Sequence, residues 1–452
     1  MSVRRWWRIW RYPGMAWSSV AAVLISSLLS GSPNLSAQNS GSIRADNFSS
    51  LYLINPEMGF LRIDQPTLSL KALWSLPLTP KLSDVLPLCN ARSGCIAAKN
   101  FRYDGRDQLF GVFPKNPEGE SVLVRDTSNP AGGSAKREVP VPAGSYQVLG
   151  LRLPDFDLTG RMEIPQPQTE APSILLTPDG RHLYIEYRDT KAQQAATAPT
   201  IAVVLDVYDA QTFKKESSIQ QSALAEKYMS GDDLLDALFS NSAYFSSDGK
   251  YIFDGLNRIE ISGGHAKKEW VNPLSSLTDV QRKVLAPYVK TVAAKPYYDF
   301  NIAESARGRT VVWMTDEKHT KLALWTTDLT TGADSPVIIS PFGSIRLADD
   351  GSRIVVEESA SRAKEGGAEA DKSGRVTTFD AASGKQTGDF SSETLRGSAG
   401  ERKSLCVSPE GALLVEATKE NILLVDLNGQ KVKAIPAAFP ANPGTACIFV
   451  KQ

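Results

Sequence analysis

A short glycine turn recurs along this chain, each time between two segments of strand-like sequence. Glycine tolerates the positive φ that a tight hairpin requires, so each turn predicts two adjacent antiparallel strands. The six turns are YDG at 103–105, PDG at 178–180, SDG at 247–249, ARG at 306–308, DDG at 349–351 and PEG at 409–411. Repetition of one hairpin over most of the chain predicts an all-β repeat fold.

A second marker is an acidic residue that closes an apolar third strand. An Asp side chain there can bond the backbone two residues further on and so begin the turn into a fourth strand. The marker occurs at Asp64, Asp126, Asp209, Glu260, Asp328, Asp380 and Asp426. Residues 174–218 contain the complete unit of four strands, and we interpret this unit as one blade of a β-propeller.

Seven markers against six turns indicate how the ring closes. The first unit, residues 50–76, begins at its second strand, and the apolar segment Thr445–Lys451 is left over after the seventh unit. We therefore predict a seven-bladed β-propeller in which the C-terminal strand completes the first blade and leaves no open edge. We expect the second unit to run from Cys95 through QLFGVFPK and SVLVRD to REVPV. Gly144–Gln168 then remains, either as a hairpin added to that blade or as an eighth blade.

Two long connections have apolar residues at helical spacing, Gln221–Phe239 and Ser276–Ala294. The second is expected to kink or split at Pro287 and to align one apolar face, made of Leu277, Val280, Val284, Leu285, Tyr288 and Val292. Connections of this kind emerge on one face of a propeller, where the inserts either pack on blade edges or cover the central channel as a lid. Because binding residues concentrate on loops held by a rigid scaffold, this face is the predicted working surface.

Residues 1–37 are typical of an export signal, with four arginines, an apolar run at 15–29 and the small-residue cleavage pattern Leu35-Ser36-Ala37. The run is shorter than the roughly 20 residues of a membrane span, although an uncleaved anchor stays open. Removing 1–37 takes away four arginines and no acid, which leaves 46 Lys+Arg against 50 Asp+Glu. This balance argues against a nucleic-acid partner. We expect residues 38–452 to form a single propeller domain that is extracytoplasmic, either periplasmic or secreted, and monomeric.

The four cysteines form two candidate pairs. Cys89 and Cys95 in CNARSGC predict a small disulfide-closed loop, because no His or further Cys lies nearby to complete a metal site. Cys406 and Cys447 lie on the inner strands of the seventh and first blades if the ring closes as predicted. They are expected either to form a disulfide or to remain two buried thiols.

Sequence motifs for catalysis are absent: the chain has no HExxH, CxxC, GxSxG or phosphate-binding glycine loop. The segment DFDLTG, with Asp155, Asp157, Thr159 and Gly160, matches the start of a calcium loop. Its twelfth position is Gln166 rather than Glu, so an Asp-rich turn is the preferred interpretation. We therefore expect no metal and no cofactor.

Further residues of interest are the histidines and one group of aromatic residues. His182, His265 and His319 are expected at the surface. Trp270, Tyr297 and Tyr298 flank the second insert, where they either pack in the core between blades or line an apolar pocket.

The units TPDGRHLYIEY, SSDGKYIFDG and SPEGALLVEAT resemble the repeats of YVTN-type and Tol-associated bacterial propellers within the wider WD-like superfamily, and LYLINPEMGFLRID resembles a YVTN unit. The resemblance covers about residues 38–452. It implies an extracytoplasmic binding protein, a part of an envelope assembly or a lactonase-like enzyme, and it carries no catalytic residue onto this chain. We therefore expect a non-enzymatic binding or scaffolding propeller for a protein or glycan partner, with a lactonase-like or other hydrolytic enzyme as the alternative.

Overall fold

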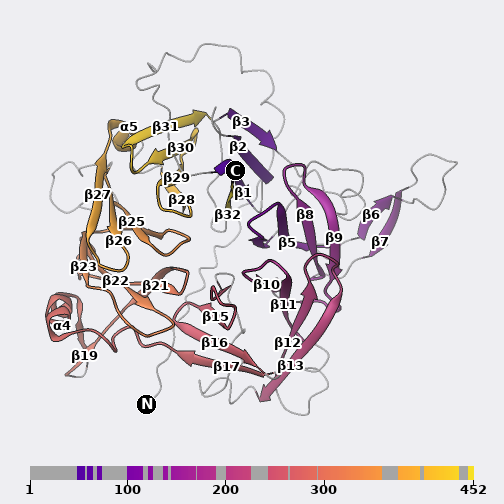
Figure 1. Cartoon of the computed structure of the whole chain (residues 1–452), viewed down its shortest axis with the longest axis horizontal. Coiled ribbons are helices and arrows are strands. Elements are labelled where there is room, and N and C mark those ends of the chain that lie inside the picture. The colour runs from indigo at the N-terminus through magenta and orange to yellow at the C-terminus, as the bar shows by residue number, and fades with distance from the viewer. Residues whose placement is uncertain are drawn as a thin grey trace, which may run out of the picture. The chain divides into compact units, whose positions relative to one another are not determined.

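Four-stranded antiparallel sheets of one design repeat seven times in the computed structural model of this chain, and they stand around a common axis as a β-propeller (Figure 1). The structure describes residues 48–55, 59–64, 69–73, 99–115, 121–125, 136–140, 144–168, 171–189, 200–224, 243–262, 265–292, 294–358, 375–397, 402–436 and 446–451. All of them belong to the unit Ser42–Gln452. The predicted seven-bladed all-β fold is confirmed.

The strands of each blade follow the chain from the inner to the outer edge, with blade 1 as the exception. Blade 1 contains β32 (Ala446–Lys451), β1 (Phe48–Asn55), β2 (Gly59–Asp64) and β3 (Ser69–Leu73). Blade 2 contains β4 (Lys99–Tyr103), β5 (Gln108–Pro114), β8 (Tyr146–Arg152) and β9 (Asp157–Glu163). Blade 3 contains β10 (Ser173–Leu176), β11 (His182–Arg188), β12 (Thr200–Asp209) and β13 (Lys215–Leu224).

The remaining four blades are regular. Blade 4 contains β14 (Tyr244–Phe245), β15 (Tyr251–Asp254), β16 (Asn257–Ser262) and β17 (His265–Trp270). Blade 5 contains β20 (Asn301–Ala306), β21 (Arg309–Thr315), β22 (Lys321–Asp328) and β23 (Ile338–Pro341). Blade 6 contains β24 (Gly343–Leu347), β25 (Arg353–Glu358), β26 (Arg375–Asp380) and β27 (Gln386–Ser391). Blade 7 contains β28 (Lys403–Val407), β29 (Leu413–Ala417), β30 (Asn421–Asp426) and β31 (Lys431–Pro436).

The C-terminal strand closes the ring, as the sequence predicts. β32 pairs antiparallel with β1, with Cys447 opposite Leu53 and Phe449 opposite Leu51. β32 also contacts β28, the inner strand of blade 7. Blade 1 is therefore built from both ends of the propeller sequence, and the two ends hold each other in place.

Among the described residues, the hydrophobic core divides into seven clusters, and each cluster lies between two neighbouring blades. One cluster joins Leu51 and Leu53 of blade 1 to Leu413 and Val415 of blade 7. Another joins Tyr52 of blade 1 to Leu149 of blade 2. Because blade 1 packs on both neighbours, burial of apolar surface continues around the whole ring.

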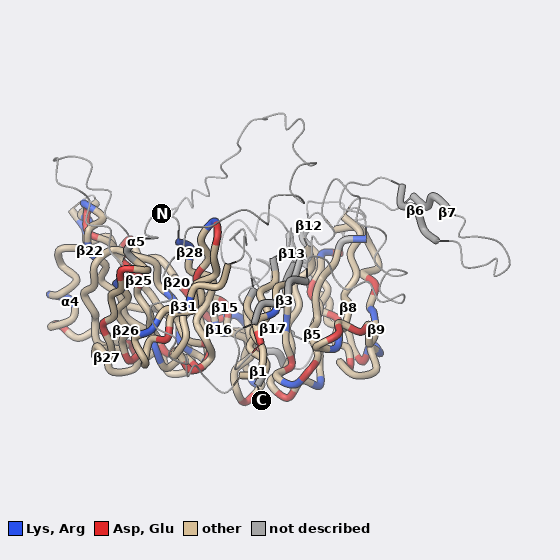
Figure 2. Tube along the Cα trace, turned by 90° about the horizontal axis from the view of Figure 1, so that it is seen from above, with Lys and Arg blue, Asp and Glu red and all other residues tan. Residues whose placement is uncertain are grey.

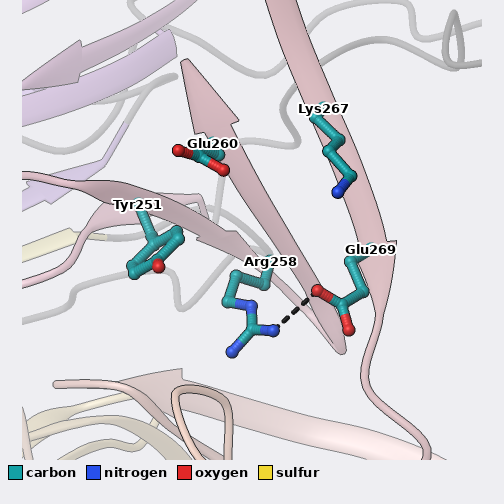
Figure 3. A pocket seen from close by; sticks show the side chains of 5 residues that line it. All are labelled: Tyr251, Arg258, Glu260, Lys267 and Glu269. Carbon is teal, nitrogen blue, oxygen red and sulfur yellow. Dashed lines mark hydrogen bonds and ion pairs between the residues drawn. The ribbon is translucent and has the colours of Figure 1, made fainter. Parts of the chain in front are cut away.

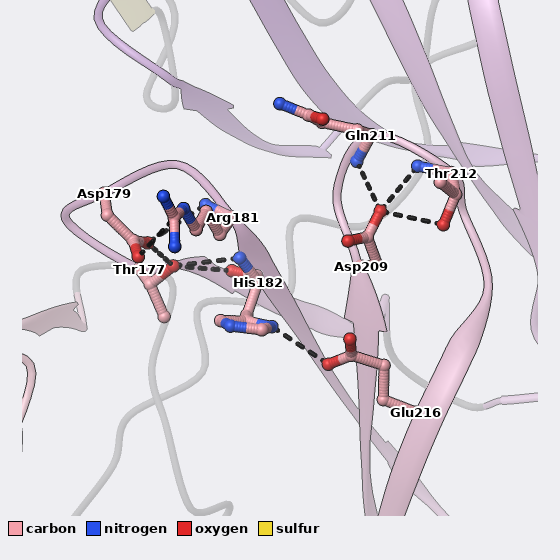
Figure 4. Close-up of polar contacts among 8 residues, drawn as sticks. All are labelled: Thr177, Asp179, Arg181, His182, Asp209, Gln211, Thr212 and Glu216. Carbon is pink, nitrogen blue, oxygen red and sulfur yellow. Dashed lines mark hydrogen bonds and ion pairs between the residues drawn. The ribbon is translucent and has the colours of Figure 1, made fainter.

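The turn residues act as the sequence predicts (Figure 4). At the first turn of blade 3, Thr177 Oγ1 donates to Asp179 Oδ1 at 2.6 Å and accepts from the His182 backbone N–H at 2.9 Å. At the third turn, Asp209 Oδ1 accepts from the backbone N–H groups of Gln211 and Thr212. Asp328, Asp380 and Asp426 bond their own turns in the same way. The prediction is wrong for Glu260, which lies within β16 rather than at its end, and Asp126 lies outside the described residues.

Blade 2 differs from the predicted assignment. SVLVRD and REVPV belong to a separate hairpin, β6 (Ser121–Arg125) and β7 (Lys136–Pro140), inserted between β5 and β8. The third and fourth strands come instead from Gly144–Gln168, so this segment is neither an added hairpin nor an eighth blade. Gly150 and Gly160 face each other there, and a Cβ on either would lie within 2.4 Å of the Phe213 ring of blade 3. The two glycines make room for that ring.

The helical insertions are smaller than predicted. In the second insert, only α4 (Asp279–Leu285) and the 3₁₀ turn η1 (Ala286–Tyr288) are helical, and β18 (Lys290–Val292) and β19 (Lys295–Tyr297) follow as a hairpin. Figures 1 and 2 place α4 at the outer rim, so it packs on blade edges and is no lid. Of the first insert, Gln221–Leu224 extends β13, and 225–239 lie outside the described residues. A further short helix, α5 (Glu393–Gly397), precedes blade 7.

Candidate functional site

Charged residues gather along the lower edge of the blades in Figure 2, where turns join the strands. The inner strands of blades 5 to 7 are an exception, because charged side chains there interact with one another and with the neighbouring strands. Arg346 on β24 donates from Nη1 to Glu304 Oε1 on β20 at 2.5 Å, and from Nη2 to the Ser404 carbonyl on β28 at 2.5 Å. Arg346 Nε donates to Ser404 Oγ at 3.1 Å. One guanidinium thus joins the inner strands of three consecutive blades.

Near Arg346 lies a buried group of two carboxyl groups and one guanidinium, which we call the buried triad: Glu357, Arg402 and Glu416. Arg402 Nη2 lies 2.9 Å from Glu357 Oε1, and Nη1 lies 3.5 Å from Glu416 Oε2. The side chains of Arg402, Glu357 and Glu416 are 2%, 11% and 0% exposed. One positive charge therefore faces two carboxyl groups away from water.

Protonation resolves the excess negative charge in the buried triad. Burial raises the pKa of Glu416 well above its usual value, and the neighbouring Glu357 raises it further. Burial also raises the pKa of Glu357, while Arg402 lowers it. Within the described residues, neither carboxylate oxygen of Glu416 accepts a hydrogen bond. A proton on Glu416 turns it into a donor toward Glu357, so the triad is best satisfied with one proton bound.

Asp349, in the turn after β24, is a third carboxylate with a raised pKa. Solvent reaches its side chain. Surrounding protein nevertheless removes part of its hydration, and this desolvation, together with the negative charge of Glu304, raises its pKa to about 6. The positive charge of Arg307 opposes the shift. Because solvent screens part of this effect at Asp349, the buried Glu416 is the stronger example of a carboxyl group with a raised pKa. A carboxyl group that titrates near pH 6 beside an arginine can serve as a general acid or base.

The sequence contains a signal for this cluster that turn motifs do not reveal. Glu186, Glu357 and Glu416 each interrupt an apolar second strand, in YIEY, VVEE and LVEA, and each is buried. A carboxylate in the middle of an apolar strand predicts a buried charge with a partner. Arg346 and Arg402 carry no comparable signal, because exposed arginines are common at such positions.

Blade 4 contains a small polar pocket lined by Tyr251, Arg258, Glu260, Lys267 and Glu269 (Figure 3). Arg258 donates to Glu269 at 2.6 Å, lies over the Tyr251 ring at 5.4 Å and donates to the Thr330 carbonyl of blade 5 at 2.6 Å. The pocket volume of about 60 Å³ suits a few water molecules. Its arginine therefore connects blades 4 and 5.

The connection between blades 4 and 5 exposes apolar side chains, contrary to the predicted buried face. Leu277, Leu285 and Tyr288 are buried, but Val280 and Val284 are 71% and 39% exposed. On the following hairpin, Val292 and Tyr297 are 56% and 48% exposed. Together with the exposed lysines between them, these residues form what we call the rim surface: Val280, Lys283, Val284, Lys290, Val292, Lys295 and Tyr297.

The three aromatic residues flanking this insert take different positions. Tyr298 packs against the core between blades 4 and 5. Trp270 is 55% exposed and Tyr297 belongs to the rim surface. The core interpretation holds for Tyr298 and is wrong for the other two, because Trp270 ends the outer strand β17 and Tyr297 lies on the exposed hairpin.

The remaining candidate residues serve the fold. Cys406 and Cys447 form a disulfide with a Cα separation of 6.3 Å, while Cys89 and Cys95 lie outside the described residues. In DFDLTG, Asp155 lies in the turn between β8 and β9, and Thr159 Oγ1 accepts from Gln108 Nε2 at 2.9 Å. Gln166 donates to Asp189 at 3.1 Å. No three His, Cys, Asp or Glu side chains in the described ranges converge as metal ligands.

The histidines are also placed by the fold. His182 Nδ1 lies 2.9 Å from Glu216 Oε2, with its side chain 40% exposed, and His319 is an exposed turn residue. The side chain of His265 lies outside the described set. In the part of the chain that the structure describes, no helix is long and apolar enough to span a bilayer.

No family model matches this chain, and no curated protein is similar to it in sequence. Solved structures are similar in fold. The periplasmic gluconolactonase PpgL of Pseudomonas aeruginosa has a TM-score of 0.39 and 13% identity, covering 89% of this chain and 99% of that one. A functionally unknown protein of Desulfotomaculum acetoxidans has a TM-score of 0.38 and 10% identity, with the same coverage. Hsv2p of Kluyveromyces lactis has a TM-score of 0.32 and 10% identity, covering 74% and 76%. Similarity at this level extends to the propeller fold alone.

Proposed function

We propose that this chain is an exported, non-enzymatic propeller that binds a protein partner through the rim surface. Seven large apolar side chains are exposed among the described residues, and all lie between Trp270 and Ile339. Four of them belong to the rim surface. Soluble proteins seldom group exposed apolar side chains unless a partner covers them.

Export is part of the same proposal. It is supported by the arginine-rich, then apolar, start of the chain and by the Cys406–Cys447 disulfide, since disulfides persist in oxidising compartments. The Ser/Thr-x-Asp/Glu-Gly turns support a YVTN-type repeat. A protein is favoured over a glycan because the rim surface is apolar.

The double substitution Val280→Ser, Val284→Ser tests the proposal. Full-length protein would be used to capture partners from an envelope fraction, with retention quantified for each recovered protein. We expect the variant to lose at least tenfold in retention of a specific partner, because both side chains point outward at α4. Ile302→Ser, at a position 44% exposed on β20, is the matched control and should retain it. Both variants should unfold at the wild-type temperature. Equal retention by all three proteins would count against the rim surface.

A hydrolytic enzyme is the second candidate, favoured by Asp349 and its neighbours Glu304 and Arg307. Lactone hydrolysis would be followed with glucono-δ-lactone at pH 5 to 8. If Asp349 is a general acid or base, Asp349→Asn should lower the rate at least 100-fold. Under the binding proposal, wild type and Asp349→Asn show the same background rate. A difference between them would replace the first proposal with the second.

A further inference from the structure

The connection that carries the rim surface is locally basic. Residues 276–298 contain Arg282, Lys283, Lys290 and Lys295 against one acid, Asp279. Residues 38–452 as a whole carry slightly more acidic than basic residues. This connection is therefore net positive where the apolar side chains are exposed, and Asp299, the residue that follows it, pairs with Lys290.

The lysines alternate with apolar side chains on the exposed faces. On α4, Val280, Lys283 and Val284 are three and four positions apart and so share one face. On the hairpin, Val292 pairs with Lys295 and Lys290 pairs with Tyr297. Directly opposed residues of an antiparallel pair share a face, so these four side chains point the same way.

The support beneath these faces is fixed. Thr278 and Gln281 form a capping box at the start of α4, and Gln281 Nε2 donates to the Ser335 carbonyl at 3.0 Å. Arg282 is turned inward, donating to the Leu274 carbonyl at 2.7 Å. Lys290 is paired with Asp299 at 2.6 Å. Lys283 and Lys295 are thus the rim lysines best placed to attract an outside charge.

We infer that the rim surface binds an acidic protein segment that presents apolar side chains between Asp or Glu residues. This inference rests on the proposed function and names the chemistry of its partner. Valines and a tyrosine contact the apolar side chains, while Lys283 and Lys295 face the carboxylates. An anionic membrane is disfavoured, because membrane-surface elements present Trp, Phe or Leu, whereas the rim surface presents three valines and one tyrosine.

The test measures fluorescence anisotropy of labelled 16-residue peptides with full-length protein. The first peptide repeats Leu and Glu, the second has Lys for each Glu, and the third has Ser for each Leu. We expect the first to bind best, and its affinity to fall as salt rises from 50 to 300 mM. The variant Lys283→Glu, Lys295→Glu should bind it at least fivefold more weakly and favour the second peptide. The control Lys250→Glu, Lys385→Glu, at exposed positions in other blades, should stay within twofold of wild type.

Equal binding of the three peptides, or wild-type affinity of Lys283→Glu, Lys295→Glu, would overturn the inference. Binding to vesicles of phosphatidylglycerol without binding to the first peptide would replace it with a membrane surface. The envelope capture separates this failure from failure of the proposed function. A partner lost with the valine variant but kept by the lysine variant leaves the binding function intact and removes the acidic partner.

Discussion

Deletion of residues 446–452 is expected to abolish the closed ring. It removes β32, so β1 loses its inner neighbour and presents an unpaired edge. It also uncovers Leu51, Leu53 and Ile54, which are fully buried, and takes away Phe449, which packs edge-on against Phe48 at 5.4 Å. Burying one such side chain is worth roughly 1.5–3 kcal/mol, so losing the burial of these four is comparable to the whole stability of an ordinary domain. Circular dichroism and thermal unfolding should show no cooperative transition.

The double substitution Cys406→Ser, Cys447→Ser is the control for this deletion. It removes the disulfide across 41 residues but keeps β32 in place. On the chain-entropy model, such a crosslink stabilises the folded protein by about 4 kcal/mol. We therefore expect the double variant to fold but to have a clearly lower melting temperature. A truncated protein that melts cooperatively at the temperature of this control would show that the strand contributes nothing beyond its disulfide, and the closure argument would fail.

Ring closure could be predicted because its determinants are local. Each turn uses a glycine or aspartate whose conformation or hydrogen bonds are decided within five residues, as at Thr177, Asp179 and Asp209. Counting such turns shows that one strand is missing at the start and one is left over at the end. The count needs no knowledge of contacts between blades.

Blade 2 and the rim surface could not be predicted for the opposite reason. The β6–β7 hairpin has the same local pattern as a blade strand pair, and only its lack of a neighbouring blade distinguishes it. The strand Tyr146–Arg152 carries Gly150 because Phe213, more than 60 residues away, fills the space above it. Val280 and Val284 fit an apolar helix face, but which side of α4 faces the core depends on Trp325 and Met314 of blade 5.

The buried triad was missed because its members come from two blades. Glu357 belongs to blade 6, whereas Glu416 belongs to blade 7 and Arg402 directly precedes the first strand of blade 7. The sequence marks the glutamates as unusual but does not say which cation meets them. That pairing depends on how blades 6 and 7 lie next to each other in the ring. It leads to the second prediction, a large loss of stability when Arg402 is replaced.

Replacing Arg402 by Met is expected to destabilise the protein by about 3–5 kcal/mol near neutral pH, because it leaves two buried carboxyl groups without a counter-charge. Methionine keeps much of the apolar volume, so the loss reports on charge rather than on a cavity. Chemical denaturation at pH 7.5 measures the change. The triple variant Arg402→Met, Glu357→Gln, Glu416→Gln removes all three ionisable groups and should recover most of the stability. A triple variant as unstable as Arg402→Met would point to packing and contradict the electrostatic account.

The stability that the buried triad contributes should also depend on pH, in a direction set by the raised pKa of Glu416. Glu416 has a raised pKa in the folded protein, so the native state holds a proton that the unfolded chain releases at lower pH. Stability from this proton is fully present below the unfolded pKa of about 4.5 and is lost as pH rises through the folded value. Glu357 and Asp349 also have raised pKa values and act in the same direction.

Wild type should therefore lose stability from pH 5 to 8, and Glu416→Gln should lose less, because its amide needs no proton. The penalty of Arg402→Met should likewise be smaller at pH 5 than at pH 8, since protonated carboxyl groups tolerate the missing guanidinium. An equal slope in wild type and Glu416→Gln would mean that Glu416 is ionised in the native state, with Arg402 alone sufficient to hold both charges.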